Sequence, residues 1–479
     1  MEFADTTKAD AAEGTLARLA LRFTDFAERW FPDAFVFVAL AVAIVVAGAL
    51  LNGAQPMAVA SAFGDGYWSL IIFTMQMALM VISGYVVAVS APVERFITWL
   101  ASLPKTGRGA VTLAAAMSMA ASLIGWAMSL VFGAMLVRAL GRRRDLTMDY
   151  RAAAAAAYLG LGATWALGIS SSAAQLQANP GSMPKALLEI TGVIPLTQTI
   201  FLWQSMLMMS LIFALSVVVA HFSAPSIEKS VTAEQIGVDL SPAPADETQP
   251  SRPGEWLEYS PLLTLVLVGI SVLWFVNEFQ TKSVLTAVSN LNTYNFFFIT
   301  LGLLLHWRPR NFLKAVQKAM PATGGIIIQF PLYGAIAAIL TQAKNAAGVS
   351  ISDQIAHAFV SMTTQDTFAI AVGIYSAVLG MFIPSGGGKW LLEAPYVMQA
   401  ANELKVHLGW TVQIYNAAEA LPNLINPFFM LPLLSIAGLK VRDIVGFTFL
   451  QFLLHTPFVL FLLWLFAMTL TYVPPVMPG

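Results

Sequence analysis

Four stretches of small, polar and helix-breaking residues interrupt long apolar segments of the chain. At membrane depth, backbone N–H and C=O groups need partners inside the protein, so irregular backbone is tolerated only where it faces protein or water. A half-helix that starts beside such a break offers free N–H groups and the positive end of its dipole to a carboxylate. Unwound carbonyl groups can hold a cation. The breaks lie at Ser122–Ser129, Gly168–Ser172, Pro384–Trp390 and Glu419–Pro427.

Two ionisable residues, Lys389 and Glu419, stand in these breaks. A charge at bilayer depth costs about 2.5–3.5 kcal/mol or more unless it has a partner. Lys389 either offers its cation to a substrate carboxylate or is a solvated residue at the outer mouth of the protein. Glu419 either takes part in coupling, by accepting a proton or standing near a cation, or forms a structural ion pair, with Lys389 as one possible partner.

We predict that the breaks together form a substrate site and that Glu419 is the coupling residue. For the serine run at 170–172, close helix packing is an equally good explanation. The Pro-Ser-Gly-Gly-Gly run favours a functional loop. The predicted substrate-binding residues are Trp126, Ser129, Ser170, Ser171, Ser385, Gly386, Gly387, Gly388, Lys389, Asn423 and Asn426.

The sequence predicts no catalytic, metal or nucleotide site. Cysteine is absent, and the five histidines show no ligand spacing such as HExxH. There is no nucleophile elbow, P-loop or GxGxxG motif. We therefore expect no resident cofactor, and coupling to a proton or sodium gradient in place of ATP. A net charge of −1 without a basic patch predicts no nucleic-acid partner.

The composition indicates that the natural solvent of this protein is a lipid bilayer. Of its 479 residues, 58% are hydrophobic and 11% are charged, whereas soluble domains carry about 25% charged residues. A spanning helix needs about 20 mostly apolar residues. The predicted spans are 33–51, 67–90, 150–172, 197–221, 259–276, 293–307, 321–342, 409–437 and 443–472, and the stretches 110–137 and 367–404 are predicted to be re-entrant hairpins. The predicted fold class is thus an all-α polytopic membrane protein.

The distribution of basic residues predicts the orientation. With the N-terminus in the cytoplasm, twenty of the 25 lysines and arginines fall on the cytoplasmic side, in agreement with the positive-inside rule. We therefore expect a multi-pass protein of the bacterial inner membrane. The remaining five fall outside or in a site: Lys185, Lys282, Lys344, Lys389 and Lys405.

Spacing along the chain indicates two similar halves. Pro56 precedes Gln76 by 20 residues, and Pro309 precedes Gln329 by the same interval. An odd number of crossings separates the halves, so the repeats are predicted to be inverted, as in many secondary transporters. The predicted units are a cytoplasmic amphipathic segment (1–31), a first repeat (32–221), a cytoplasmic linker (222–256), and a connecting span with the second repeat (257–479).

Five stretches carry a family resemblance that extends over about 31–466: Gly64–Trp68, Met75–Leu79, Pro384–Trp390, Ile436–Leu439 and Arg442–Ile444. They resemble the short-chain fatty acid transporter family, which is distantly similar to C4-dicarboxylate and aminobenzoyl-glutamate carriers. The resemblance implies uptake of butyrate, acetoacetate or similar acids, coupled to protons or sodium. It also implies a homodimer of scaffold and transport domains, with site residues at Trp126, Ser385–Lys389, Glu419 and Asn423.

Two other function classes remain open from the residues alone. A sodium-coupled dicarboxylate or amino-acid carrier would share the fold, but a dicarboxylate needs a second cationic partner and only Lys389 stands in the breaks. A membrane-embedded transferase would need clustered His, Asp or Glu residues at one depth. The leading prediction is a secondary transporter that imports small monocarboxylates by cation symport.

Overall fold

The computed structural model describes residues 34–241, 252–282, 287, 290–383 and 385–477. These residues are mostly helical; extended pairing among them is limited to one isolated bridge between Gly192 and Val476. The predicted all-α class is confirmed. The predicted amphipathic segment at 1–31 lies outside the described residues.

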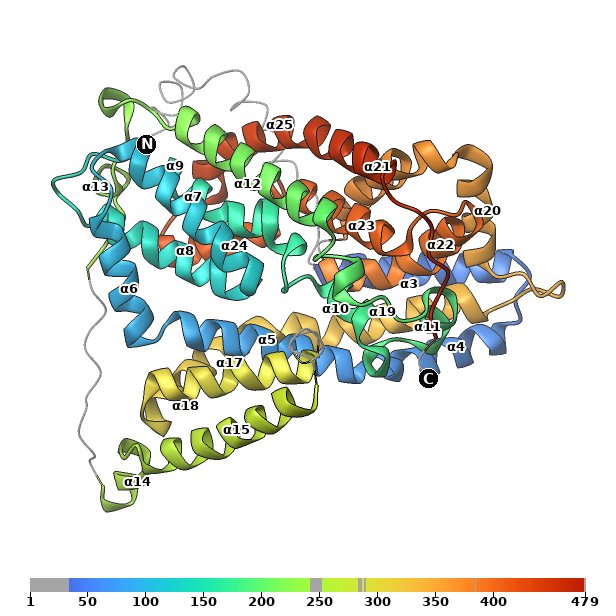
Figure 1. Cartoon of the computed structure of the whole chain (residues 1–479), viewed down its shortest axis with the longest axis horizontal. Helices are drawn as coiled ribbons and strands as arrows, with labels where there is room; N and C mark the ends of the chain where they lie inside the picture. The colour runs from blue at the N-terminus through green and yellow to red at the C-terminus, as the bar shows by residue number, and fades with distance from the viewer. Residues whose placement is uncertain (1–33, 242–251, 283–286, 288–289, 384, 478–479) are drawn as a thin grey trace, which may run out of the picture.

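The first half of the chain supplies the helices up to α12, and the short helix α13 lies within the predicted linker (Figure 1). Proline or glycine stands at or beside the start of α4, α6, α7 and α8, as expected where chain direction changes. The helices are α3 (Ala34–Leu51), α4 (Pro56–Ser69), α5 (Ile71–Ala88), α6 (Ala91–Ser102), α7 (Gly107–Ile124), α8 (Trp126–Gly141), α9 (Tyr150–Leu159), α10 (Ser172–Ala178), α11 (Lys185–Thr191), α12 (Trp203–Ser223) and α13 (Ala233–Ile236).

The second half begins with a short helix and a long apolar one. Pro309 begins α18 just as Pro56 begins α4, and both are proline at the first helical position. The helices are α14 (Trp256–Tyr259), α15 (Leu262–Thr281), α17 (Leu291–His306), α18 (Pro309–Ala319), α19 (Gly324–Gln342), α20 (Ile351–Met362), α21 (Gln365–Phe382), α22 (Gly386–Glu403), α23 (Leu408–Asn423), α24 (Pro427–Ala437) and α25 (Val441–Ala467).

Within the described residues, seven helices are long and apolar enough to cross a membrane. An eighth crossing results if α23 and α24, bent by 59° at their junction, count as one broken span. The multi-pass class is therefore confirmed, while nine crossings and two inverted repeats stay predictions. The seven are Pro56–Ala88, Gly107–Ile124, Tyr150–Ala178, Trp203–Ser223, Pro253–Thr281, Pro309–Gln342 and Val441–Ala467.

The two stretches predicted as hairpins are each a pair of helices joined by a tight connection. Gly125 links α7 to α8 in an extended conformation, with φ −155° and ψ 110°. Ser385 has a similar conformation at the start of α22, with φ −155° and ψ 102°. Because α7 is itself long enough to cross a membrane, the re-entrant course of these pairs stays a prediction.

A glycine crossing fixes α4 against α19. A Cβ on Gly66 would lie 2.7 Å from the carbonyl oxygen of Gly334, and a Cβ on Gly334 would lie 2.5 Å from that of Gly66. The backbones therefore touch, which is how small residues let membrane helices pack. The layer that holds α5, α17 and α19 lies below the one that holds α7, α8, α12 and α23 in Figure 1.

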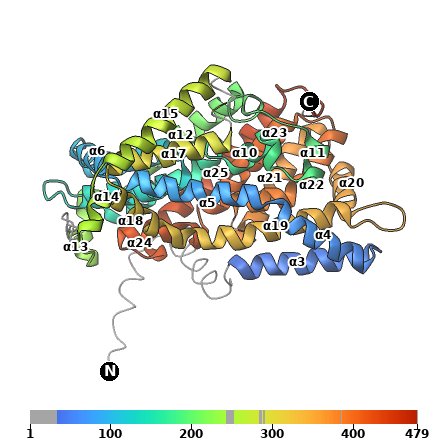
Figure 2. The same cartoon turned by 90° about the horizontal axis from the view of Figure 1, so that it is seen from below.

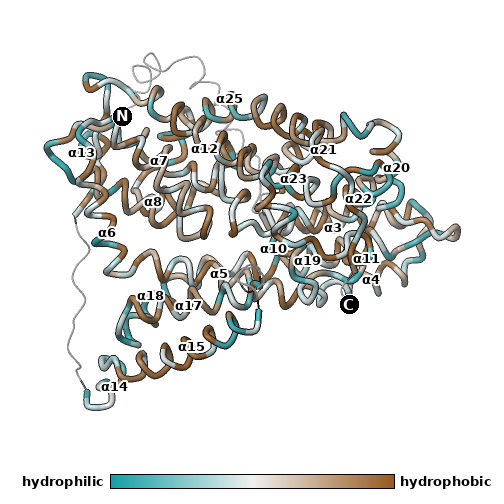
Figure 3. The backbone as a smooth tube through the Cα atoms, viewed as in Figure 1, coloured by the Kyte–Doolittle hydropathy of each residue, from teal (hydrophilic) through white to brown (hydrophobic). Residues whose placement is uncertain are grey.

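Helix α15 lies at the margin of the molecule and is the least covered of the seven long helices. Only 11% of its apolar window is buried inside the protein. Figure 2 shows α15 and α3 on opposite margins, and Figure 3 shows hydrophobic residues along most of α15. An apolar helix surface that the rest of the described protein leaves uncovered is typical of a helix that contacts lipid.

The first part of the predicted linker packs against helices. The N–H of Tyr150 donates to the carbonyl of Val231 at 2.9 Å, and Arg142 Nε donates to the carbonyl of Leu240 at 2.7 Å. Arg138 reaches both the carbonyl of Asp239, at 3.0 Å, and that of Ile436, at 3.2 Å. Residues 231–240 therefore pack against α8 and α9, and Arg138 also joins α8 to the end of α24.

Candidate functional site

A cavity of about 330 Å³ lies where four helices begin. Trp126 is the first residue of α8, Ser172 of α10 and Gly386 of α22, and Phe428 is the second residue of α24. Three of the four sequence breaks thus contribute residues to one cavity, and Phe428 follows directly after the fourth. Its other lining residues include Met77, Leu161, Trp165, Gln329, Phe330, Ser385, Gly387 and Phe429.

Side-chain caps explain why three of these helices begin where they do. Ser171 Oγ accepts from the N–H of Ala174 at 3.2 Å, and Ser385 Oγ accepts from that of Gly388 at 3.2 Å. Asn426 Oδ1 accepts from the N–H of Phe428 at 3.1 Å. Each side chain satisfies one of the N–H groups that a helix start leaves without an intrahelical partner. In the first turn of α22, the N–H groups of Gly386 and Gly387 have no hydrogen-bond partner among the described residues, so they can bind a ligand.

The three glycines of α22 let aromatic rings approach the backbone. A Cβ on Gly386 would collide with the ring of Trp165, and one on Gly388 with the ring of Tyr333. At Gly387 a Cβ would lie 3.3 Å from Phe330 Cζ and 3.2 Å from Ser172 Cβ. The run therefore places free N–H groups beside an apolar wall of rings.

Behind the cavity, Lys389 lies at the centre of a fully buried polar cluster. Its Nζ is 2.7 Å from Glu419 Oε2 and 2.9 Å from Glu393 Oε1. It also donates to the carbonyl and the hydroxyl of Ser376, each at 2.8 Å. The ring of Tyr415 lies 4.5 Å from Nζ, in cation–π distance. Lys389, Glu393 and Glu419 are each 0% exposed, so the solvated alternative for Lys389 is wrong.

Glu393 is the member of this cluster that sequence analysis missed. It follows Lys389 by four residues on α22, a spacing that places two side chains on the same helix face. The four-residue spacing is visible in the sequence, but Glu393 lies outside the four breaks from which the site residues were predicted. Ser376 Oγ donates to Glu393 Oε1 at 3.2 Å, which links α21 to the cluster.

Of the predicted substrate-binding residues, Trp126, Ser385, Gly386 and Gly387 line the cavity. Gly388 and Lys389 follow directly on α22 but do not line it. The remaining side chains serve local contacts. Ser129 donates to the carbonyl of Trp126 at 3.0 Å, and Ser170 donates to that of Ser122 at 2.6 Å. Ser171 donates to Asn416 Oδ1 at 3.0 Å, and Asn426 caps α24. Asn423 is buried, and neither of its amide atoms is hydrogen-bonded to a described residue.

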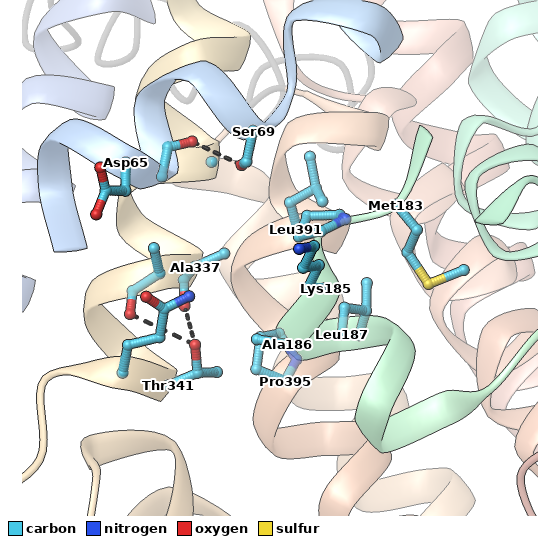
Figure 4. Close-up of a pocket in the computed structure, with 15 residues that line it drawn as sticks. Asp65, Ser69, Met183, Lys185, Ala186, Leu187, Ala337, Thr341, Leu391 and Pro395 are labelled. Carbon is cyan, nitrogen blue, oxygen red and sulfur yellow. Dashed lines mark hydrogen bonds between the residues drawn. The ribbon is translucent and has the colours of Figure 1, made fainter. Parts of the chain in front are cut away.

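A second cavity, of about 340 Å³, lies further along α19 and α22 (Figure 4). Figure 4 shows Asp65 and Ser69 of α4, Lys185 of α11, and Thr341 of α19 around it. On α19 the first cavity is lined up to Phe330 and the second from Gly334 onward. Tyr333 lies between them, packed against Gly388, and is 1% exposed.

The described residues include no group of three or more His, Cys, Asp or Glu side chains that could hold a metal ion. The lining of the first cavity, as far as it is described, includes no charged side chain. The cavity therefore combines an uncharged polar end, built from helix starts, with an aromatic wall. This arrangement suits a small anion with an apolar tail, because backbone N–H groups at helix starts bind carboxylates.

The sequence profile of the short chain fatty acid transporter family matches residues 15–466. The chain belongs to the short-chain fatty acid transporter family. A candidate short-chain fatty acid transporter of Escherichia coli (strain K12) is 33% identical over 437 residues, which are 90% of this chain and 96% of that protein. A second candidate member, from Haemophilus influenzae, is 30% identical over 461 residues, 92% of this chain and 98% of that protein. This short-chain fatty acid transporter family consists of transporters, not enzymes.

Two solved structures share the fold of this family member. Alcanivorax borkumensis YdaH, described as a transporter, aligns with a TM-score of 0.54 at 12% identity and covers 91% of this chain and 97% of its own. Neisseria gonorrhoeae MtrF, described among antimetabolite efflux pumps, aligns with a TM-score of 0.53 at 12% identity and covers 96% of this chain and 99% of its own. At this identity the likeness concerns the fold alone.

Proposed function

We propose that this protein is a secondary active transporter that imports short-chain fatty acids, such as butyrate or acetoacetate, by cation symport. The observation that carries the proposal is the cavity at the start of α22, with free N–H groups of Gly386 and Gly387 at one end and aromatic rings on its wall. Its 330 Å³ lies at the small end of the range of about 300–1,000 Å³ that is usual for ligand sites.

In this proposal the substrate carboxylate binds the first turn of α22. Hydrogen bonds from Gly386 and Gly387, together with the helix dipole, stabilise its negative charge. The acyl tail lies against Trp126, Trp165 and Phe330. The uncharged lining supports a monocarboxylate, because a second carboxylate would be desolvated without a cationic partner.

The coupling ion is a proton or sodium, and Glu419 takes part in its binding. Support comes from the complete burial of Glu419 next to Lys389, which lies two residues beyond Gly387 of the cavity. We further propose that the protein lies in the bacterial inner membrane as a homodimer, with its N-terminus in the cytoplasm. These points rest on the charge asymmetry of the sequence and on the family resemblance.

Solute counterflow in liposomes tests the transport proposal. Purified protein is reconstituted into liposomes loaded with unlabelled butyrate, and entry of labelled butyrate is followed without any ion gradient. Because the neutral acid crosses bilayers unaided, every rate is compared with that of protein-free liposomes at the same pH. Labelled butyrate entering faster through the protein supports the proposal, and excess unlabelled butyrate outside should compete. Equal rates with and without protein would reject it.

A further inference from the structure

We propose that Lys389, Glu393 and Glu419 form a binding site for one transported proton, with Glu393 as the second carboxylate. The inference rests on the proposed transport of a carboxylate and identifies the coupling ion of that same process. It is carried by the charges, the burial and the free oxygen atoms of this cluster.

The charge of the cluster is the first argument. One ammonium group faces two carboxylates, so the fully ionised cluster carries a net charge of −1. All three side chains are 0% exposed. An uncompensated buried charge is costly, whereas a neutral, hydrogen-bonded group of charges is tolerated. One proton on either carboxylate makes the cluster neutral.

The oxygen atoms supply the second argument, because each carboxylate has one oxygen that is not paired with Lys389. Glu393 Oε1 and Glu419 Oε2 both lie within 3 Å of Lys389 Nζ. Glu393 Oε2 and Glu419 Oε1 are buried and have no hydrogen-bond partner in the described part of the chain. Buried polar atoms in native proteins are nearly always partnered. A proton on one of these oxygens turns that carboxylate into a neutral carboxylic acid.

The surroundings fit a proton better than a metal ion. Four oxygen atoms, from Ser376, Glu393 and Glu419, already point at Nζ. Neither of the two cavities along α22 is lined by Glu393 or Glu419. A metal ion would need space and a shell of oxygen ligands, whereas a proton needs one lone pair.

The remaining titratable groups around the cluster are phenols. They are Tyr333 on α19, Tyr375 on α21, Tyr396 on α22 and Tyr415 on α23, and the hydroxyls of Tyr375 and Tyr396 are 2.8 Å apart. Phenols are neutral at physiological pH, so they leave the charge of the cluster unchanged. The proton count therefore depends on Lys389, Glu393 and Glu419 alone.

Tyr415 connects this cluster to the substrate cavity. Its hydroxyl donates to the carbonyl of Gly386, which lines the cavity, while its ring lies 4.5 Å from Lys389 Nζ. A carboxylate bound at Gly386 and Gly387 brings a second negative charge to the same end of α22. Protonation of the cluster offsets that charge, so substrate and proton are bound together.

The test compares Glu393→Gln with wild type in liposomes, using two readouts. Glutamine mimics the protonated carboxyl and makes the cluster permanently neutral, so butyrate counterflow, which needs no net proton movement, should remain above that of protein-free liposomes. The initial rate of butyrate uptake under an inward proton gradient, after subtraction of the rate in protein-free liposomes, should fall to the rate measured without a gradient. Glu403→Gln, which changes an exposed carboxylate at the end of the same helix, serves as the control and should take up butyrate under the gradient as wild type does.

Proton counting with a pH-indicator dye gives an independent readout on wild-type protein, which should move about one proton with each butyrate. Glu419→Gln creates the same neutral charge state and should behave as Glu393→Gln does, should the latter fail to fold. Gradient-driven uptake by Glu393→Gln at the wild-type rate would overturn the inference. So would uptake by wild type that follows a sodium gradient without proton movement. Absence of counterflow in wild type would instead reject the transport proposal itself.

Discussion

The ring of Tyr333 lies directly against the backbone of Gly388, at the point where α19 and α22 separate two cavities. Any side chain at Gly388 would collide with this ring. Tyr333 therefore stands between the cavity beside Phe330 and the cavity beside Gly334.

Tyr333→Ala should open a passage between the cavities. The loss of the ring is expected to reduce stability by about 3–5 kcal/mol, and the folded fraction should release butyrate from loaded liposomes faster than wild type. Labelled butyrate efflux without any ion gradient is the measurement. Tyr333→Phe keeps the ring and should match wild type. Unchanged efflux from folded Tyr333→Ala would show that the ring does not close the passage.

The absence of cysteine permits single-cysteine labelling without a background. Ile326→Cys places a thiol in the first cavity, and Ala337→Cys places one in the second. Butyrate should slow alkylation at position 326 severalfold and leave position 337 nearly unchanged. Mass spectrometry after a timed reaction measures both rates. Equal protection at the two positions would indicate a global effect of butyrate on the protein.

Alanine substitution of three glycines should impair transport and stability to different degrees. Gly324 has open space around it, Gly387 has neighbours at 3.2 and 3.3 Å, and Gly386 faces the ring of Trp165 with no room for a Cβ. Gly324→Ala should be nearly neutral, Gly387→Ala should raise the KM for butyrate severalfold, and Gly386→Ala should lower the melting temperature as well. Counterflow kinetics and thermal unfolding measure the series. A reversed order would place the substrate elsewhere.

Phe429→Ala should shift the preference toward longer acids. This side chain forms part of the cavity wall, and its removal leaves room for further methylene groups. Each buried methylene contributes about 0.8 kcal/mol, or roughly fourfold in affinity. Competition by unlabelled acids of increasing length against labelled butyrate gives the preference. Ile327→Ala, an exposed change on α19, should leave it as in wild type.

Lys389→Met should destabilise the protein by about 3–5 kcal/mol, because it leaves two buried carboxylates without their cation. Lys344→Met removes an exposed lysine and should change stability by less than about 0.5 kcal/mol. Unfolding in a fixed detergent, followed by tryptophan fluorescence, compares the two. An equal effect would contradict the stabilising role of Lys389. Lower pH should partly rescue Lys389→Met, since protonation neutralises the carboxylates.

The sequence allowed us to predict the breaks but not which side chains face the ligand. Pro-Ser-Gly-Gly-Gly and Asn426-Pro427 interrupt helices for local reasons, so their positions follow from residue type. The direction of Ser170 and Ser171 depends on α7 and on Asn416 of α23, which are distant in sequence. For the same reason, the composition could not show that Lys389 is fully buried between carboxylates.

Element boundaries were predictable where composition changes sharply. The segments predicted at 33–51, 197–221, 259–276 and 293–307 are the helices α3, α12, α15 and α17, with ends that differ by up to six residues, because polar segments flank them. The span predicted at 67–90 begins earlier, since α4 and α5 form one apolar run from Pro56. The π-helical turn at Gly160–Thr164 has no signal in periodicity. It arises where a Cβ on Gly160 would lie 2.6 Å from the carbonyl oxygen of Ser118.

The backbone contact between Gly66 and Gly334 has a mechanical consequence. Two helices whose main chains touch cannot slide past one another without losing that contact, so we expect α4 and α19 to move together as one rigid unit. A solute that passes from the cavity beside Phe330 to the cavity beside Thr341 moves along this pair of helices. We therefore expect the movement that permits its passage to involve α22 and the helices packed on it, while the contact between α4 and α19 is kept.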